Sequence, residues 1–206
     1  MGQPLRPGRR RLNQRVRIIA GTHRGRRLDA PDWPGLRPTS DRLRETLFNI
    51  LAPRMPDATV LDGCAGTGAV GIEALSRGAA HVTFVDQDRR AAALVSANLQ
   101  RCGITEGYAI IRADLGHFQA RLPQPAYDVI FLDPPYTTDP APLAGAVSGF
   151  LAPGGVLVIE HATRRHVPDQ AGALGRVRTV RSGDSTLSFF AGDALGSPGG
   201  LDDPQQ

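Results

Sequence analysis

The chain has 206 residues, 41% hydrophobic and 21% charged, with a formal net charge of +4, and this length allows one ordinary globular domain to form without disulfides. Its two cysteines, Cys64 and Cys102, form neither a CxxC pair nor a zinc-ligand spacing, which disfavours a disulfide scaffold or a metal site and favours a reducing compartment. No apolar run approaches the roughly 18 residues of a membrane span and no secretory signal is visible, so we expect a cytoplasmic protein with no membrane partner.

The positive charge is concentrated at the start of the chain. Residues 1–54 contain 13 arginines and four acidic residues, a net charge of +9, whereas the remainder carries −5. Arginine binds phosphate oxygens in pairs and remains charged, so this distribution indicates nucleic acid as the partner. Residues 1–14, which combine Pro and Gly with an arginine run, are expected to form a solvated, disordered basic tail. Strand signals at 17–21 and 25–28 predict a β-hairpin that presents a fixed array of arginines, and contacts with nucleic acid are expected from Arg24, Arg26, Arg27, Arg37 and Arg42.

A helix and then an alternating α/β pattern follow the hairpin. After a loop at 31–38, Thr39 or Ser40 can cap a helix that runs to about Leu51, where Pro53 and Pro56 end it. Short apolar runs then alternate with helical segments, which is typical of a parallel sheet covered by helices. The expected strands are 59–62, 81–86, 108–112, 127–133 and 156–160, and the expected helices are 68–77, 89–101 and 141–151.

Two further strands are expected near the C-terminus. Segments 176–181 and 186–190 have no helix between them, so they predict an antiparallel hairpin at the sheet edge. The predicted fold is therefore a Rossmann-like, mostly parallel sheet of seven strands with helices on both faces, preceded by a small hairpin and helix. Residues 192–206 contain almost nothing to bury and are expected to be disordered.

A glycine-rich turn follows the first strand of this sheet. Gly66, Gly68 and Gly71 have the GxGxxG spacing, which by itself also fits a nicotinamide-dependent oxidoreductase with Asp86 as its ribose-binding acid. However, Asp62 ends the strand, and Gly63, Cys64 and Ala65 intervene before Gly66. A carboxylate at this point suits a cation better than a pyrophosphate. S-adenosylmethionine, with its ammonium and sulfonium groups, therefore fits the turn best.

Two other acids follow neighbouring strands. Asp86 ends the second strand and would accept hydrogen bonds from both ribose hydroxyls of the cofactor. Asp114 follows the third strand and would accept from the adenine amino group, although a role in capping its own loop fits equally well.

The fourth strand ends in Asp133, Pro134, Pro135 and Tyr136, at the sheet edge where open α/β folds bind ligands. The prolines restrict the backbone, so the Asp133 carboxylate and the Pro134 carbonyl can accept both N–H bonds of one nucleobase amine. Such positioning can direct the nitrogen lone pair at the sulfonium methyl. Tyr136 offers an aromatic face to a base swung out of its stack. The structural alternative is a strand-ending turn with a packed tyrosine.

Together these residues resemble the class I S-adenosylmethionine-dependent amino-methyltransferases, and more narrowly the bacterial 16S rRNA (guanine-966-N2)-methyltransferase family. The resemblance covers roughly residues 17–190, and its specific part lies at 17–28 and 36–51. It implies that Thr39, Ser40 and Asp41 line the methionine end of the cofactor, that 62–68 and Asp86 hold it, and that 133–136 present the guanine.

The resemblance also implies the substrate and the division of the chain. The substrate would be 16S rRNA within the assembled small ribosomal subunit. Residues 15–54 would contact RNA and cover the cofactor, and 55–191 would form the class I methyltransferase domain. The sequence departs from the family pattern at Gly63 and Cys64, where a bulkier pair is expected, and at both extended termini. One sheet in a chain of this size is consistent with a monomer, which we expect.

Four alternative functions fit the sequence less well. An adenine-N6 DNA methyltransferase would use the same tetrapeptide, but the residues after Tyr136 leave no room for a target-recognition segment. A nicotinamide-dependent oxidoreductase and a non-enzymatic ribosome-assembly factor are less consistent with the tetrapeptide. A cytosine-C5 methyltransferase would require a thiolate near the base, whereas Cys64 lies in the cofactor loop and no Pro-Cys dipeptide occurs.

Overall fold

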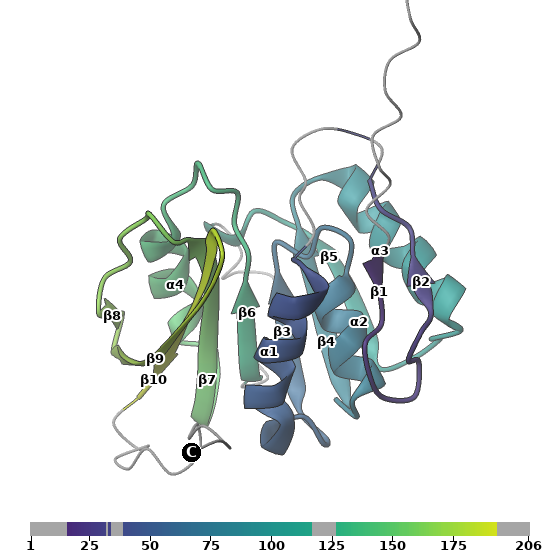
Figure 1. Cartoon of the computed structure of the whole chain (residues 1–206), viewed down its shortest axis with the longest axis horizontal. Coiled ribbons are helices and arrows are strands. Elements are labelled where there is room, and N and C mark those ends of the chain that lie inside the picture. The colour runs from purple at the N-terminus through teal and green to yellow at the C-terminus, as the bar shows by residue number, and fades with distance from the viewer. Residues whose placement is uncertain (1–15, 32, 34–38, 117–126, 193–206) are drawn as a thin grey trace, which may run out of the picture.

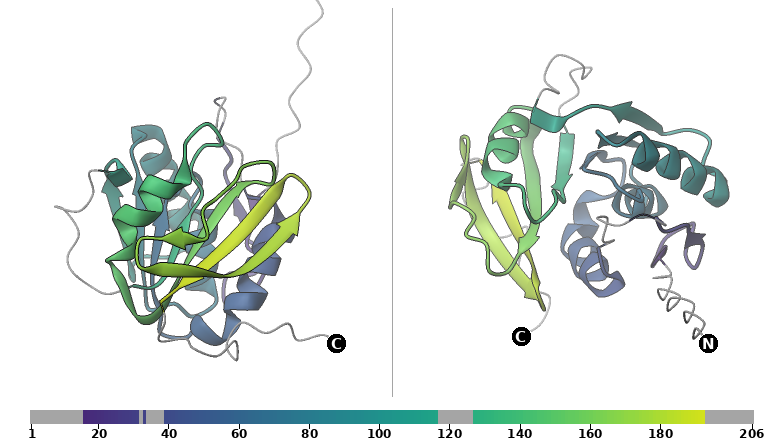
Figure 2. Two further views of the ribbon diagram at one scale, coloured as in Figure 1. Left: turned by 90° about the vertical axis from the view of Figure 1, so that its left-hand side faces the viewer. Right: turned by 90° about the horizontal axis from the view of Figure 1, so that it is seen from above.

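A computed structural model describes residues 16–31, 33, 39–116 and 127–192 of the chain. The predicted tail at 1–14, nearly all of the tail at 192–206 and Arg37 lie outside these residues. The main sheet contains eight described strands in the order β5-β4-β3-β6-β7-β10-β9-β8, with helices on both faces (Figures 1 and 2). The predicted fold class is confirmed, with one strand more than expected.

The strands divide into a parallel part and an antiparallel part. The parallel strands are β3 (Thr59–Gly63), β4 (His81–Asp86), β5 (Tyr108–Arg112), β6 (Tyr127–Leu132) and β7 (Leu151–Ala162). The antiparallel strands are β8 (Gln170–Ala171), β9 (Leu174–Ser182) and β10 (Ser185–Ala191). Strand β3 pairs with both β4 and β6, so the strand order reverses there. Open α/β sheets bind ligands at the carboxyl ends of the strands at such a point.

The helices are α1 (Asp41–Leu51), followed by a 3-10 turn η1 (Ala52–Arg54), α2 (Ala69–Ser76), α3 (Arg89–Cys102) and α4 (Pro140–Ser148). Helices α1, α3 and α4 begin at side-chain caps that the sequence supplies, whereas α2 follows Gly68 and has no side-chain cap. Ser40, one of the two predicted caps, accepts a hydrogen bond from the Leu43 amide at 3.2 Å. Asp88 and Asp139 cap α3 and α4 in the same way, which satisfies amides that a helix leaves unpaired at its start.

Two hydrophobic clusters lie on opposite faces of the sheet. The first packs beneath α1, α2 and α3 and extends from Ile18 of the N-terminal segment to Phe189 of β10. The second packs beneath α4 and includes Leu132 and Phe190. The N-terminal segment therefore shares its core with the main sheet. Within the described residues, no helix is both long enough and apolar enough to cross a membrane.

Several predicted boundaries were wrong. The N-terminal strands β1 (Val16–Arg17) and β2 (Arg27–Leu28) contain only two residues each, because the amides of Ile19, Ala20 and His23 bond to side chains of α2 and not across the hairpin. Helix α4 ends at Ser148, before Gly149, and β7 starts at Leu151, earlier than predicted. Strand β8 was not predicted, because a strand of two residues is too short to show an alternation of apolar and polar side chains.

Candidate active site

The parallel strands bring the predicted residues of the glycine loop and the tetrapeptide to one edge of the sheet. Strand β3 ends at Gly63 and leads into the glycine loop, while Asp86 ends β4 and Asp133 follows β6. Leu132 is paired with Ile159 of β7, so the next residues along, Asp133 and Glu160, emerge side by side. Residues far apart in the sequence thus converge because neighbouring parallel strands end at the same edge.

Hydrogen bonds to carboxylates hold the glycine loop in place. The Gly66 amide donates to Asp86 Oδ2 at 3.0 Å, and the Gly71 amide donates to Asp62 Oδ2 at 2.8 Å. Gly66 and Gly68 have φ angles of 56° and 74°, a left-handed conformation that glycine adopts without steric cost. The loop therefore presents backbone to the site.

Asp62 lies beneath this loop and is 2% exposed. Burial raises the pKa of Asp62 to about 8, the Gly71 bond lowers it and the charge of Asp86 adds to the rise. A cation bound beside Asp62 would favour its ionised form.

Cys64 lies among the acids of this site. Burial raises the pKa of its thiol, and the charges of Asp86, Asp133, Asp62 and Asp114 raise it further. The thiol is therefore protonated at neutral pH and is a poor nucleophile, which argues against cytosine-C5 chemistry. A Cβ atom on the neighbouring Gly63 would lie 2.6 Å from Leu132 Cδ2. A larger residue at position 63 would therefore require the Leu132 side chain to move.

Asp133 is linked to a second acid that the sequence analysis missed. The Thr39 hydroxyl lies 2.9 Å from Glu160 Oε2 and 3.3 Å from Asp133 Oδ2. A hydroxyl has one proton to donate, so both contacts are favourable when one of the two carboxyl groups is itself protonated. Burial, followed by the charge of Glu160, raises the pKa of Asp133 well above its ordinary value, while the Thr39 bond lowers it.

Glu160 is 4% exposed and lies at the end of the apolar part of β7. A carboxylic acid directly after four apolar residues of a buried strand is unusual, so the sequence itself contained a signal for Glu160. Its partner could not be deduced, because only the β6–β7 register places it beside Asp133.

Tyr136 ends the tetrapeptide with its side chain at the surface, and 39% of the residue is accessible to solvent. Its hydroxyl bonds to Ser185 Oγ at 2.7 Å, and its backbone carbonyl accepts from Arg165 Nη2 at 2.8 Å. Pro134 is buried and Pro135 is exposed. The residue is thus held through its hydroxyl and its backbone carbonyl and is still partly exposed to solvent, as an aromatic platform for a base requires.

The remaining predicted cofactor residues lie in two places. Asp114 Oδ1 accepts from the Gly116 amide at 2.8 Å, so it does cap its own loop. It also lines a hollow of about 330 Å³, together with Gln87, Arg112 and Ala113. Asp41 instead accepts hydrogen bonds from Arg17 and Arg44 and so belongs to the N-terminal network.

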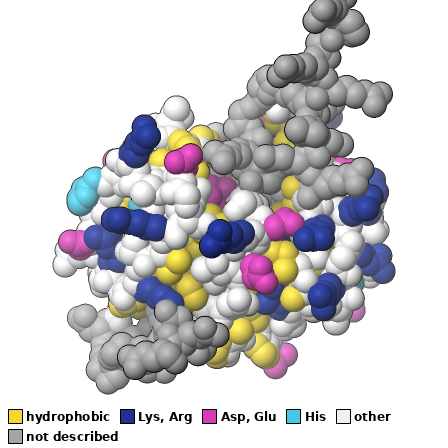
Figure 3. Space-filling view, viewed as in Figure 1, with side chains coloured by type: hydrophobic (Ala, Val, Ile, Leu, Met, Phe, Trp, Pro, Cys, Tyr) yellow, Lys and Arg dark blue, Asp and Glu magenta, His cyan; other side chains and the backbone are white. Residues whose placement is uncertain are grey.

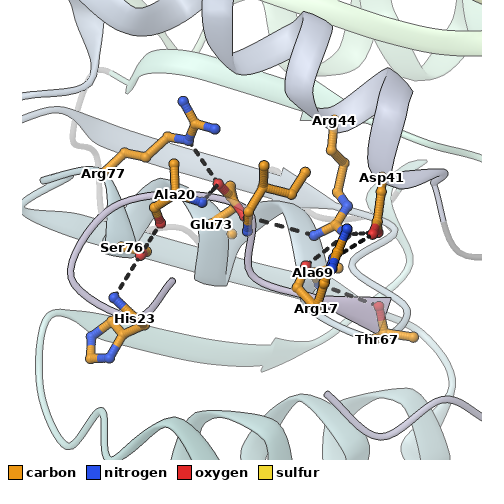
Figure 4. A network of polar contacts seen from close by, with 12 residues as sticks. Arg17, Ala20, His23, Asp41, Arg44, Thr67, Ala69, Glu73, Ser76 and Arg77 are labelled. Carbon is orange, nitrogen blue, oxygen red and sulfur yellow. Dashed lines mark hydrogen bonds and ion pairs between the residues drawn. The ribbon is translucent and has the colours of Figure 1, made fainter. Parts of the chain in front are cut away.

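That network anchors the N-terminal segment on α2 (Figure 4). Glu73, which is fully buried, accepts from the amides of Ile19 and Ala20 at 2.7 and 3.0 Å and from Arg77 Nε at 2.8 Å. Ser76 Oγ donates to the Ala20 carbonyl and accepts from the His23 amide. These bonds fix the turn between β1 and β2.

The arginines on this turn remain accessible. Arg24, Arg26 and Arg27 are exposed, and so is Arg42 on α1. Arg26 donates to the Arg101 carbonyl at the end of α3 at 3.2 Å, and Arg24 follows His23, whose amide is bonded to Ser76 of α2. The turn therefore presents positive charge at the surface.

Comparisons with known proteins point to one family. The family model described as conserved hypothetical protein 95 matches residues 16–191. Ribosomal RNA small subunit methyltransferase D from Haemophilus influenzae is 41% identical over 150 residues, 70% of this chain and 78% of that protein. The Escherichia coli protein of the same name is 47% identical over 122 residues, 59% of this chain and 60% of that protein. A hypothetical protein from Thermus thermophilus has a similar structure, with a TM-score of 0.71, 32% identity and coverage of 84% and 98% of the two chains.

Proposed function

The chain belongs to the conserved hypothetical protein 95 family, that of ribosomal RNA small subunit methyltransferase D, and on this premise we propose that it methylates the N2 amine of a guanine in 16S rRNA with S-adenosylmethionine as donor. The observation that carries the proposal is the tetrapeptide 133–136 beside the glycine loop, at the strand-order reversal. The substrate would be the small ribosomal subunit, and the chain would act as a monomer in the cytoplasm.

The acids of the glycine loop support a cationic cofactor. The carboxyl groups of Asp62, Asp86, Asp114 and Asp133 all lie close enough to act on the Cys64 thiol, so a cation bound at the loop would favour their ionised forms. This environment would repel the pyrophosphate of a dinucleotide and attract an ammonium or sulfonium group. S-adenosylmethionine would supply an electrophilic methyl group there, held by the 62–68 loop and Asp86, with its adenine towards Asp114.

The chain's own residues would position the base. The Asp133 carboxylate and the Pro134 carbonyl would accept the two N–H bonds of the amine and direct the nitrogen lone pair at the methyl carbon. S-adenosylmethionine would donate its methyl group to this nitrogen, and the electron pair of the broken S–C bond would stay on sulfur. The methylated nitrogen then loses a proton, and the raised pKa of Asp133 suits its carboxylate to accept it. Tyr136 would stack on the flipped base.

The test is transfer of labelled methyl from S-adenosylmethionine to small subunits purified from a strain that lacks this gene. Mass spectrometry of the nucleosides should find N2-methylguanosine at one site. N6-methyladenosine would instead support the adenine alternative. Cofactor binding without transfer would move the substrate to DNA or free RNA, and thermal stabilisation by NAD alone would reject the proposal.

Substitution of Asp133 by alanine separates catalysis from cofactor binding. Asp133→Ala removes one of the two acceptors for the amine, so transfer should fall at least about a thousandfold, since positioning can contribute several kcal/mol to the barrier. Calorimetry should find S-adenosylmethionine binding nearly unchanged. Asp139→Ala, which alters an exposed helix cap, is the matched control. Full activity of Asp133→Ala would exclude the proposed role.

A further inference from the structure

A second basic surface lies on the C-terminal side of the tetrapeptide. A pocket of about 330 Å³ is bounded by β7, β9, β10 and the connection after β7. Its lining includes four arginines, Arg164, Arg165, Arg176 and Arg181, and it contains hydroxyl groups but no acidic side chain. None of these arginines lies in the N-terminal half of the chain, where the composition had placed the positive charge.

One hydrogen bond connects this pocket to the candidate active site. Arg165, which lines the pocket, donates to the Tyr136 carbonyl at 2.8 Å. A strand of nucleic acid whose base stacked on Tyr136 would therefore reach the pocket with an adjacent nucleotide.

The four arginines are not equivalent. Arg165 donates a hydrogen bond to the Tyr136 carbonyl. Arg176 forms an ion pair with Asp169 and donates a hydrogen bond to the Val167 carbonyl. Arg164 and Arg181 are exposed, and within the described residues no hydrogen bond or ion pair occupies their guanidinium groups. Two arginines thus shape the pocket, and two remain able to bind an anion.

A polar floor completes the pocket. His161 is 6% exposed, and its ring nitrogens contact the Ala162 carbonyl at 3.1 Å and Ser188 Oγ at 2.9 Å. Thr163 and Thr186 contact each other through their hydroxyls at 3.0 Å. Hydroxyls and arginine forks are the groups that bind phosphate oxygens of nucleic acids.

From this arrangement we propose that the pocket binds a phosphodiester of the RNA strand next to the base held at Tyr136, an inference that rests on the proposed function. Its volume lies at the lower end of the range for small-ligand sites, which suits one nucleotide. Arginine side chains gather both over β8–β10 and along the side of the molecule where β1 and β2 lie (Figure 3). The RNA would be held from both sides of the tetrapeptide.

The double variant Arg164→Gln/Arg181→Gln tests this inference, because it removes the two available charges and disturbs no described hydrogen bond or ion pair. Arg178→Gln is the matched control. Arg178 lies opposite Phe189 in the β9–β10 register, so its side chain is on the face of β9 that does not line the pocket. Binding of a labelled single-stranded RNA and of undermethylated small subunits is measured over a series of salt concentrations, together with binding of S-adenosylmethionine.

The double variant should bind RNA at least about tenfold more weakly than the unaltered chain. The slope of log K against log salt should fall by roughly 0.7 for each phosphate that the variant no longer neutralises. Cofactor binding should not change, and neither effect should occur in Arg178→Gln. Methyl transfer at saturating subunit concentration should persist.

Equal RNA affinity and salt slope in the double variant and the unaltered chain would overturn the inference, while methyl transfer would leave the proposed function intact. Saturable binding of adenosine monophosphate that the variant abolishes, with RNA affinity unchanged, would assign the pocket to a free nucleotide and would also overturn it. An unaltered chain that binds no RNA would overturn both proposals.

Discussion

Asp133 and Glu160 form a pair of carboxyl groups joined by the Thr39 hydroxyl. Two ionised carboxylates in a buried site repel each other, so one proton shared between them is favourable. A substrate amine that donates hydrogen bonds to the Asp133 carboxylate would favour its ionised form.

Removal of the Glu160 charge should shift the pH dependence of catalysis. Because that charge raises the pKa of Asp133, Glu160→Gln should lower this pKa and move the acid limb of kcat/KM against pH to lower pH. Glu160→Asp keeps the charge and should keep the limb closer to its original position. The measurement is the pH profile of methyl transfer, and a limb that stays in place in Glu160→Gln would contradict the coupling.

Asp62 should make the stability of the chain depend on pH. Its folded-state pKa is raised from 3.8 to about 8, so the folded state retains a proton that the unfolded chain has lost. The free energy of unfolding should therefore fall as pH rises from 5 to 8, by as much as about 1.4 kcal/mol per pH unit from this group. Urea unfolding of Asp62→Asn should show a flatter dependence.

The control for this measurement is Asp184→Asn, which removes the same charge at an exposed position. Its pH dependence should match that of the unaltered chain. A dependence as steep in Asp62→Asn as in the unaltered chain would show that Asp62 is ionised throughout, in conflict with its burial.

At the scale of elements, the N-terminal segment depends on α2 for its conformation. Strands β1 and β2 pair through only two residues each, which is too little to be stable alone. Glu73 and Ser76 supply the hydrogen-bond partners that the short ladder lacks. An arginine-rich turn is thereby made rigid without a long hairpin.

Loss of Glu73 should release this segment. Glu73→Ala leaves the Ile19 and Ala20 amides and the Arg77 guanidinium without their acceptor, so unfolding should become easier by about 3 to 5 kcal/mol. Trypsin should cleave faster after Arg24, Arg26 or Arg27. Glu106→Ala, at an exposed position on the α3–β5 connection, should change neither quantity. Unchanged cleavage in Glu73→Ala would show that the anchor lies elsewhere.

At the scale of the whole molecule, the N-terminal segment and the sheet share one core. Ile18, which is 1% exposed, belongs to the same hydrophobic cluster as Phe189 of β10. Segments of a chain that share one buried core are expected to unfold together. The basic N-terminal segment is therefore part of the cooperative unit that carries the site.

A core substitution in the segment should destabilise the entire chain. Ile18→Ala should lower the free energy of unfolding by about 2 to 5 kcal/mol through lost burial and a cavity. Circular dichroism and hydrogen exchange of β3 amides should report the same single transition. A second transition confined to the N-terminal residues would show instead that they fold separately.

Local patterns determined much of this protein. The alternation of apolar runs and helical segments predicted the parallel sheet, since burial on both faces requires it. The Ser40 cap and the antiparallel C-terminal hairpin were also readable, because each depends on neighbouring residues. The family resemblance rested on contiguous motifs for the same reason, and the comparisons confirmed it.

Only the tertiary structure decided which distant residues meet. The bridge from Thr39 to Glu160 joins residues 121 positions apart, and the Glu73 anchor joins residues 53 and 54 positions apart. Neither has a local signal, because the strand register and the packing of α2 create both. The basic pocket at β7, β9 and β10 arises likewise from strand pairing, which gathers arginines that are scattered along an otherwise acidic part of the sequence.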